Sequence, residues 1–304
     1  MNESNAPIAL FVFNRLEHTR RTVDALRANE RAAQSDLFVF CDGARDAKDA
    51  PAVASVREFV RGITGFRSCT VIESEKNRGL AASIISGVTE VLRRHPRVIV
   101  MEDDLVTSPF FLRYMNEALD YYETDDRVAS IHGYVYPTLL PLPETFFLRG
   151  ADCWGWATWR RGWALFNPNG TELLAGLRTL GLTREFDFDG AFQYTSMLQD
   201  QISGANNSWA IRWYASAFLA NKVTLYPGRS LVINIGTDAS GTHCGSTDTF
   251  DVTSSTSPLH IGGVPVADSP EGRAAFTEFG KRNHLGSAVK HRLGRLARKL
   301  RLRA

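Results

Sequence analysis

The first 105 residues alternate short apolar runs with segments of helical periodicity, and this alternation restricts the fold more than any other feature of the sequence. One run and its helix together take about 30 residues. Alternating strands and helices predict a mostly parallel, doubly wound sheet with helices on both faces, and uninterrupted apolar runs predict strands buried on both faces. The expected strands are 8–13, 37–40, 70–72 and 98–101, and the expected helices are roughly 18–29, 51–63 and 80–94.

The alternation stops near residue 125, and aromatic residues become dense in the second half. We expect further helices near 190–202 and 209–220, a strand at 223–226, and a long loop rich in Gly, Ser and Thr at 237–258. The chain of 304 residues is thus expected to form one large α/β domain. Its predicted parts are a first half at 1–135, a second half at 136–280 and a tail at 281–304.

The cellular location is expected to be cytoplasmic. The sequence has no run of about 18 apolar residues, which predicts no membrane span. Its first residues lack a basic stretch before an apolar one, which predicts no secretion signal. The four cysteines are far apart in the sequence and form no CxxC motif, so we expect reduced thiols at Cys41, Cys69, Cys153 and Cys244.

Charge divides the chain into an acidic body and a basic tail. The tail at 281–304 has nine Lys or Arg and no acid, which leaves 26 bases and 33 acids on residues 1–280, a net charge of −7. An acidic body argues against nucleic-acid binding. Within 289–303, Val289, Leu293, Leu296 and Leu300 recur at helical spacing between basic residues, which predicts a basic amphipathic helix. Such helices bind anionic membrane surfaces, and a solvated terminus is the alternative.

Ligands of doubly wound sheets bind beyond the carboxyl ends of the strands, so the residues there are the candidates for a ligand site. The first strand ends in Phe13-Asn14-Arg15, without the GxGxxG turn of dinucleotide-binding proteins, and the chain has no P-loop motif. The fourth strand ends in Glu102-Asp103-Asp104. Three adjacent acids at the end of a buried strand repel one another, and a hard divalent cation would relieve that cost and neutralise a diphosphate. The alternative is that these acids favour the dipole of a following helix.

Two other strand ends carry residues suited to a nucleotide. Asp42, after the second strand, can accept the imide N–H of uracil, although Asp-Gly is also a common turn former. Asn77-Arg78-Gly79 opens a helix, where backbone N–H groups and the Arg78 side chain suit a phosphate or ribose. The alternative for Arg78 is an ordinary surface side chain.

These motifs together resemble the nucleotide-binding half of the GT-A glycosyltransferases over roughly residues 7–135. FVFNR is similar to the opening strand of that fold, FCDGARD to its Asp-Gly turn, and NRGLAASIISG to a helix of the large inverting family. EDDL followed by PFFLRYMNEAL is most similar to the N-acetylglucosaminyltransferase I family. The resemblance implies a GT-A fold that binds a nucleotide-sugar, with a UDP-sugar as the expected donor, and transfers the sugar to a glycan or lipid-linked acceptor.

The same resemblance implies a role for each matching residue. Asp42 would contact the base, and Asn14 and Arg15 would line the nucleotide pocket. Asp104 would bind Mn²⁺ (or Mg²⁺) directly, and Glu102 and Asp103 would support the metal or the donor sugar.

In the second half, Asp152-Cys153-Trp154-Gly155-Trp156 resembles the Gly-Trp segment that faces donor and acceptor, with Trp156 as the expected sugar contact. The alternative is that these tryptophans belong to the core. An inverting transferase also needs a carboxylate base. Relatives place it near a Trp-flanked segment, which here is Asn206 to Trp213 and has no acid. Asp200 is therefore the expected base, with Asp187 and Asp189 as alternatives, and His243 is an expected contact of the metal or diphosphate.

Three function classes remain after these observations. The first is a glycosyltransferase, for which inversion by direct displacement is expected although the sheet motifs also serve retaining enzymes. The second is a nucleotidyltransferase that makes nucleotide-sugars, but FNRLEHTR lacks the glycines expected of its first loop. The third is a non-catalytic carbohydrate-binding protein with a decayed site, which the missing acids around Trp209 favour.

Overall fold

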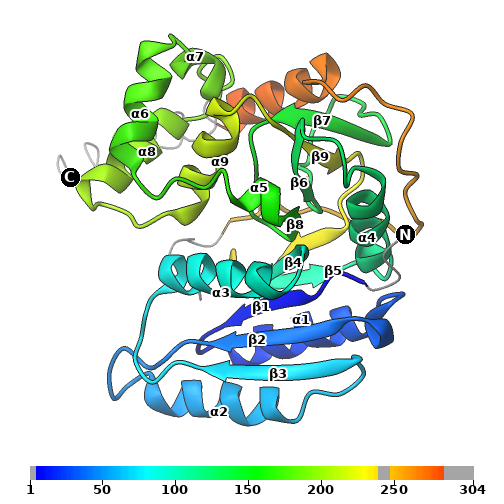
Figure 1. Cartoon of the computed structure of the whole chain (residues 1–304), viewed down its shortest axis with the longest axis vertical. Coiled ribbons are helices and arrows are strands. Elements are labelled where there is room, and N and C mark those ends of the chain that lie inside the picture. The colour runs from blue at the N-terminus through cyan, green and yellow to red at the C-terminus, as the bar shows by residue number, and fades with distance from the viewer. Residues whose placement is uncertain (1–4, 239–246, 284–304) are drawn as a thin grey trace, which may run out of the picture.

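The computed structural model describes residues 5–238 and 247–283, which form a layered α/β structure (Figure 1). An eight-stranded sheet has the order β3-β2-β1-β4-β8-β6-β9-β7, and β10 and β5 form a separate two-stranded sheet. The strands are β1 (Ile8–Val12), β2 (Asp36–Cys41), β3 (Ser68–Glu73), β4 (Arg97–Glu102), β5 (Leu105–Thr107), β6 (Val128–His132), β7 (Thr145–Arg149), β8 (Trp156–Trp159), β9 (Val223–Pro227) and β10 (Val232–Asn234). The helices are α1 (Leu16–Arg27), η1 (Ala32–Gln34), α2 (Ala50–Arg61), α3 (Leu80–Arg94), α4 (Phe111–Tyr121), α5 (Arg160–Trp163), α6 (Gly170–Thr179), α7 (Thr183–Phe186), α8 (Tyr194–Ser203) and α9 (Trp209–Leu219).

Strands β1 to β4 form the predicted doubly wound unit. They pair in parallel, with β1 between β2 and β4. Because successive side chains of a strand point to opposite faces, Leu10 packs with α1 and α2 in one core, and Phe11 packs with Ile84 and Val88 of α3 in the other. The predicted α/β class with helices on both faces is therefore confirmed.

The second half extends the same sheet with strands of mixed direction. Strand β8 lies antiparallel between β4 and β6, β9 is parallel to β6, and β7 closes the edge antiparallel to β9. The sheet has four parallel and three antiparallel pairings. It crosses the boundary expected at residue 135, because β6 precedes that residue and pairs with two strands that follow it.

The four predicted strands and the three predicted helices of the first half are all present, but one expectation about burial is wrong. Every residue of β1 is buried, whereas β3 alternates exposed and partly buried residues. Strand β3 is one of the two edge strands of the sheet, and its residue Ile72 is 38% exposed. An edge strand has a partner on one side only, which its apolar sequence does not reveal.

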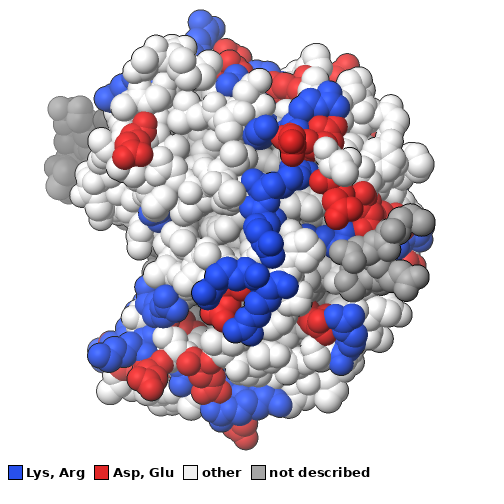
Figure 2. Space-filling view, in the orientation of Figure 1, with Lys and Arg blue, Asp and Glu red and all other residues white. Residues whose placement is uncertain are grey.

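The chain ends, within the part that the structure describes, in a helix at residues 270–283. The predicted basic helix at 289–303 lies outside the described residues. On the face shown in Figure 2, acidic and basic side chains are interspersed. Among the described residues no helix is long and apolar enough to span a membrane. Cys41, Cys69 and Cys153 are free thiols, as predicted, and Cys244 lies outside the described range.

Candidate nucleotide-sugar site

The candidate site lies where the direction of winding changes. From β1 the chain proceeds to β2 and β3 on one side, and it returns through α3 to β4 on the other side of β1. Where the connections after two neighbouring parallel strands lead in opposite directions, a crevice opens at the carboxyl ends of these strands, and such sheets bind ligands there. Arg15 follows β1, and Glu102-Asp103-Asp104 ends β4, so both predicted groups meet at this crevice.

Arg15 joins two of the three acids. Its guanidinium forms an ion pair with Asp103 and another with Asp104, the latter at 2.8 Å between Nη2 and Oδ2. The side chains of Arg15, Asp103 and Asp104 are 19%, 7% and 16% exposed, so solvent screens these pairs only weakly. Burial alone would lower the pKa of Arg15, but the two carboxylates outweigh burial and raise it.

Two acids of this cluster, Glu102 and Asp103, have a raised pKa and hold their protons more tightly than free carboxyl groups. Burial raises the pKa of Asp103 to about 6, although the neighbouring Arg15 acts in the opposite direction. Burial, then the charges of Asp104 and Asp103, raise the pKa of Glu102 well above its ordinary value. A bound cation would favour the charged form of both groups.

A segment after β10 closes over this cluster. The backbone N–H of Ile235 donates to the carbonyl of Asp104 at 2.8 Å. A methyl group on Gly236 would lie 2.1 Å from Oδ2 of Asp104 and 3.1 Å from Nη1 of Arg15, so only glycine allows this approach. His18 of α1 contacts the same segment, because Nε2 lies 3.2 Å from the Asp238 carboxylate. Sequence reasoning missed His18, which carries no motif.

Asp42 lies at the end of β2 as predicted, but its carboxylate already has four donors. Oδ1 accepts the backbone N–H of Gly43 and of Arg78, each at 2.8 Å. Oδ2 accepts the N–H of Gly79 at 2.9 Å and the Nδ2 amide of Asn77 at 3.0 Å. Since a carboxylate offers about four acceptor positions, a hydrogen bond to a base would have to replace one of these. The geometry therefore favours a role for Asp42 in positioning the 77–79 segment.

The predicted nucleotide-binding residues Asn14 and Arg78 occupy the same end of the sheet. The Nδ2 amide of Asn14 donates to Asp49 at 3.0 Å, which fixes the turn after β1 against the start of α2. Arg78 is exposed and immediately precedes the N-terminus of α3. Its guanidinium and the first N–H groups of that helix can bind an anion there.

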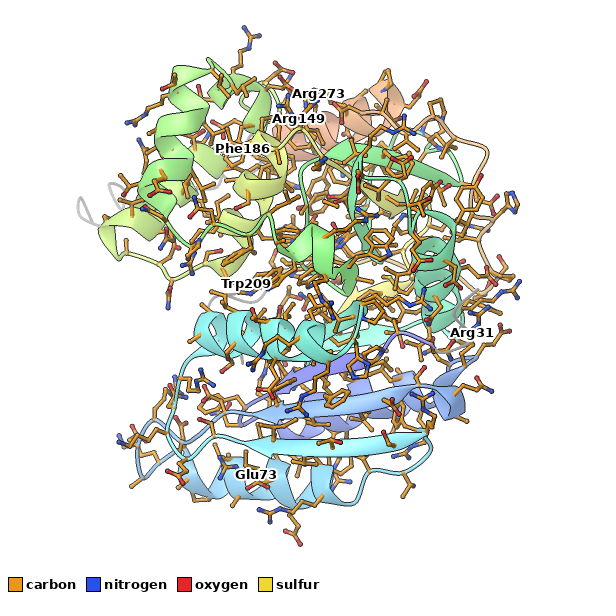
Figure 3. All side chains as sticks on the ribbon, viewed as in Figure 1. Arg31, Glu73, Arg149, Phe186, Trp209 and Arg273 are labelled. Atoms are coloured by element: carbon orange, nitrogen blue, oxygen red, sulfur yellow. The ribbon has the colours of Figure 1, made fainter. Side chains whose placement is uncertain are left out.

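The structure contradicts the expected sugar contact of Trp156. This side chain is 1% exposed, and its ring centroid lies 5.5 to 5.8 Å from those of Trp163, Trp213 and the Trp209 labelled in Figure 3. A ring packed on its faces by Trp163, Trp209 and Trp213 has no face left for a sugar. Trp154, two residues earlier, is only partly buried, and it contacts Tyr134 and Phe250 edge-on.

Asp152 is the candidate residue that the sequence motif contained but that we did not single out. Its carboxylate is 25% exposed, lies 3.7 Å from Nε2 of His132, and accepts a 3.4 Å hydrogen bond from Tyr226. Burial, then the charges of Asp152, Glu102 and Asp104, raise the pKa of the Cys153 thiol well above its usual value. Because Val100 of β4 pairs with Trp156 of β8 in antiparallel register, the chain just before β8, which includes Asp152, runs beside the carboxyl end of β4 where the acidic cluster lies.

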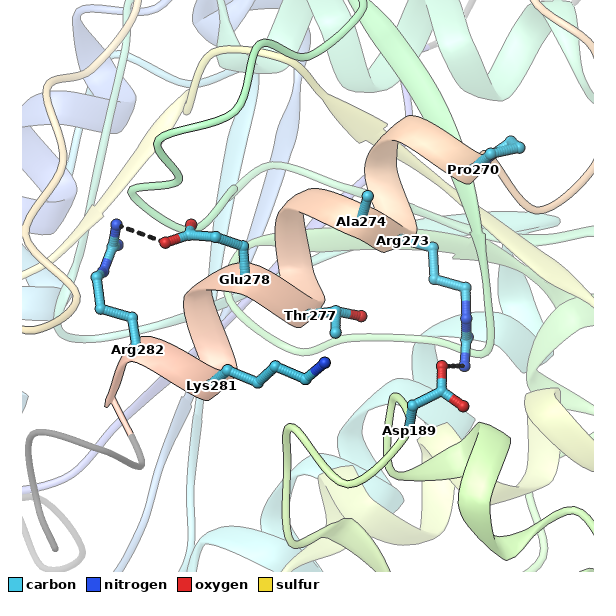
Figure 4. Close-up of a pocket in the computed structure, with 8 residues that line it drawn as sticks. All are labelled: Asp189, Pro270, Arg273, Ala274, Thr277, Glu278, Lys281 and Arg282. Atoms are coloured by element: carbon cyan, nitrogen blue, oxygen red, sulfur yellow. Dashed lines mark hydrogen bonds and ion pairs between the residues drawn. The ribbon is translucent and has the colours of Figure 1, made fainter.

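The alternatives for a base are less well placed. Asp200 lies on α8 with an exposed side chain. Asp187 accepts the backbone N–H of Thr195 at 2.7 Å, and Asp189 forms ion pairs with Arg184 and with Arg273, the latter shown in Figure 4. Both of these acids therefore stabilise the turn between α7 and α8. His243, the other predicted metal contact, lies outside the described residues.

The residues at the crevice suit a divalent cation that is completed by phosphate oxygens. Within residues 5–238 and 247–283, no three His, Cys, Asp or Glu side chains converge on one metal position. Mg²⁺ and similar ions are, however, commonly held by one or two carboxylates together with substrate phosphates. Asp103 and Asp104 provide two such carboxylates, and both already bind a cationic group, the guanidinium of Arg15.

No protein-family model and no curated protein sequence matches this chain. Among solved structures, the chain is similar to the mannosyltransferase PcManGT from Pyrobaculum calidifontis, solved with GDP-Man and Mn²⁺, at 15% identity and a TM-score of 0.32 over 44% of this chain and 36% of the other. A Desulfovibrio desulfuricans protein described as a nucleotide-diphospho-sugar transferase is similar at 13% identity and a TM-score of 0.32, over 52% of this chain and 64% of the other. S. aureus TarS 1–349 is similar at 11% identity and a TM-score of 0.34, over 53% of this chain and 48% of the other. The chain thus spans less than two thirds of each of these proteins.

Proposed function

We propose that this protein is a metal-dependent glycosyltransferase of the GT-A type, which transfers a sugar from a nucleotide-sugar to a glycan or lipid-linked acceptor. The observation that carries the proposal is the meeting of Arg15, Asp103 and Asp104 in the crevice between β1 and β4. A doubly wound sheet binds nucleotides at this position. The acids at the end of β4 can hold a metal ion. The N-terminus of α3 and the neighbouring Arg78 can bind the diphosphate to which that metal ion is attached.

Each part of the site has a role in this proposal. Arg78, Asn14 and the N-terminus of α3 bind the nucleotide, and Asp42 holds the 77–79 segment in place. Asp103 and Asp104 hold the cation, which would neutralise the diphosphate as it leaves. Because Arg15 pairs with the same two carboxylates, a cation held by them would take the place of its guanidinium as their partner.

Inversion by direct displacement requires one base. The acceptor hydroxyl attacks the anomeric carbon, its proton passes to a carboxylate, and the bond to the nucleoside diphosphate breaks. Asp152 is our first candidate for this carboxylate, since it lies near the acidic cluster among aromatic rings that suit a sugar. Asp200, the base expected from the sequence, is the alternative.

Calorimetric titration tests the donor site. UDP and GDP are titrated into the protein with and without Mn²⁺, and the titrations are repeated with Asp104→Ala. The control is Asp126→Ala, which removes an acid that is 85% exposed and lies just before β6, at the opposite edge of the sheet from the carboxyl end of β4. We expect Mn²⁺-dependent binding of one nucleotide to the wild type and the control but not to Asp104→Ala. If neither nucleotide binds under any condition, the transferase proposal fails and a non-catalytic protein is favoured.

The base is tested separately, with release of nucleoside diphosphate from a panel of nucleotide-sugars as the readout. Asp152→Asn should bind the nucleotide normally and release the diphosphate on the order of 10²-fold more slowly, the usual contribution of a general base. Asp200→Asn should behave as the wild type. The reverse pattern would assign the base to Asp200.

A further inference from the structure

A proline-rich loop at residues 137–143 presents two consecutive leucines to solvent. Leu139 is 76% exposed, the highest value of any large apolar side chain in the described part of the chain, and Leu140 is 42% exposed. Single exposed leucines are common on protein surfaces. These two are adjacent, however, whereas Leu142 in the same loop packs partly against the core.

The loop is attached to the helix at residues 270–283. The Arg282 guanidinium donates to the carbonyl of Pro137 at 2.6 Å, and it also pairs with Glu278 at 3.1 Å, as Figure 4 shows. The ring of Tyr136 stacks on Phe279 at a centroid distance of 4.5 Å. The two leucines are therefore held at the surface by the last turns of this helix.

The basic part of the chain begins at the same place. Arg282 contacts the loop directly, and the following residues 284–304 contain seven Lys or Arg and no acid. A surface that offers both negative charge and an apolar interior complements the basic residues and the leucines together. An anionic lipid bilayer has both properties, because its headgroups attract basic segments and its acyl chains accept apolar side chains.

We propose that residues 137–143 form a membrane-contact loop, which inserts Leu139 and Leu140 into an anionic bilayer. The loop follows directly after Tyr136, whose hydroxyl lies 3.4 Å from that of Tyr194 on the aromatic side of the site. Burial raises the pKa of both tyrosines, and the charge of Asp152 raises it further. Membrane contact therefore brings the acceptor side toward the lipid surface and selects a lipid-linked acceptor, a consequence that rests on the proposed function.

Vesicle flotation of the full-length protein tests this loop. The double variant Leu139→Ser with Leu140→Ser is compared with the wild type on phosphatidylglycerol–phosphatidylethanolamine vesicles and on phosphatidylcholine vesicles. The matched control is Leu180→Ser, which changes a leucine that is 62% exposed at the end of α6. We expect the wild type and the control to float with anionic vesicles alone, and the affinity of the double variant to fall on the order of 10²-fold through the loss of two partly exposed leucine side chains.

Two results would overturn the proposal. One is equal affinity of the double variant and the wild type, and the other is a wild type that does not float with anionic vesicles. A third result, a dimer of the wild type that the double variant lacks in light scattering, would assign the leucines to a contact between two copies and would also overturn it. Circular dichroism spectra and urea unfolding of the same variants show that they are folded, independently of nucleotide binding. Loss of nucleotide binding in the wild type would remove the proposed function and leave the flotation result standing.

Discussion

Replacement of Asp42 by asparagine distinguishes a base contact from a positioning role. In the variant, one carboxylate oxygen becomes an NH₂ group that faces two donors instead of accepting from them. A hydrogen bond to a charged acceptor contributes about 1.5–3 kcal/mol, and the residue is 8% exposed, so the donors that lose it gain little from water. Two lost interactions, partly relieved by rotation of Asn77, give an expected destabilisation of about 3 kcal/mol.

Urea unfolding measures this loss. With a slope of about 3 kcal/mol per molar urea, the midpoint of Asp42→Asn should fall by about 1 M. The matched control is Asp46→Asn, because Asp46 also accepts two backbone N–H groups, from Lys48 and Asp49, but is exposed. The free energy of unfolding of Asp46→Asn should differ from that of the wild type by at most about 0.5 kcal/mol. If Asp42→Asn unfolds like the wild type and yet loses nucleotide binding, the carboxylate contacts the ligand and the positioning argument is refuted.

Three further predictions concern the site. The His132 side chain is fully buried, and burial lowers its pKa below 6.5 despite the charge of Asp152. The folded state therefore loses stability as the pH falls below about 6.5. In His132→Phe, the free energy of unfolding measured from pH 8 to 5 should lose this contribution to its pH dependence. Gly236→Ala should weaken Mn²⁺-dependent nucleotide binding on the order of 10²-fold by displacing Asp104, whereas Gly62→Ala, whose methyl group would meet only an ordinary 3.5 Å contact, should not. Arg15→Met should cost about 3–5 kcal/mol at pH 7 by leaving buried acids unpaired, and less at pH 5, where Asp103 with its pKa of about 6 is protonated. Mn²⁺ should raise the melting temperature of Arg15→Met more than that of the wild type, and an equal rise would show that the metal does not bind these carboxylates.

Local patterns predicted the strands and α-helices from β1 to β4 because each of them is long enough to show its own periodicity. Strands β5 and β10 have three residues each, too few to show a period, and yet they place Gly236 against Asp104. The positions of Arg15 and the acids followed from a rule about strand ends, which depends on topology alone. The four donors of Asp42 did not follow from its Asp-Gly turn, because three of them come from residues 77–79 across the sheet.

The tryptophans show a different reason for failure. An aromatic ring suits a sugar or a core equally well, and only the packing of Trp156 against three other tryptophans decides between them. Asp152 was missed for the converse reason. Its neighbour Cys153 lies near Glu102 only because β8 pairs with β4, and nothing in either segment indicates that pairing.

The position of β8 also has consequences for biosynthesis. Strand β4 leaves the ribosome well before β8, and until residues 156–159 follow, one edge of β4 lacks its partner. An unpaired strand edge is a template for association with another chain. A fragment that ends at residue 135 should therefore self-associate even though it contains every strand of the doubly wound unit, and the nascent protein needs its second half to protect the first.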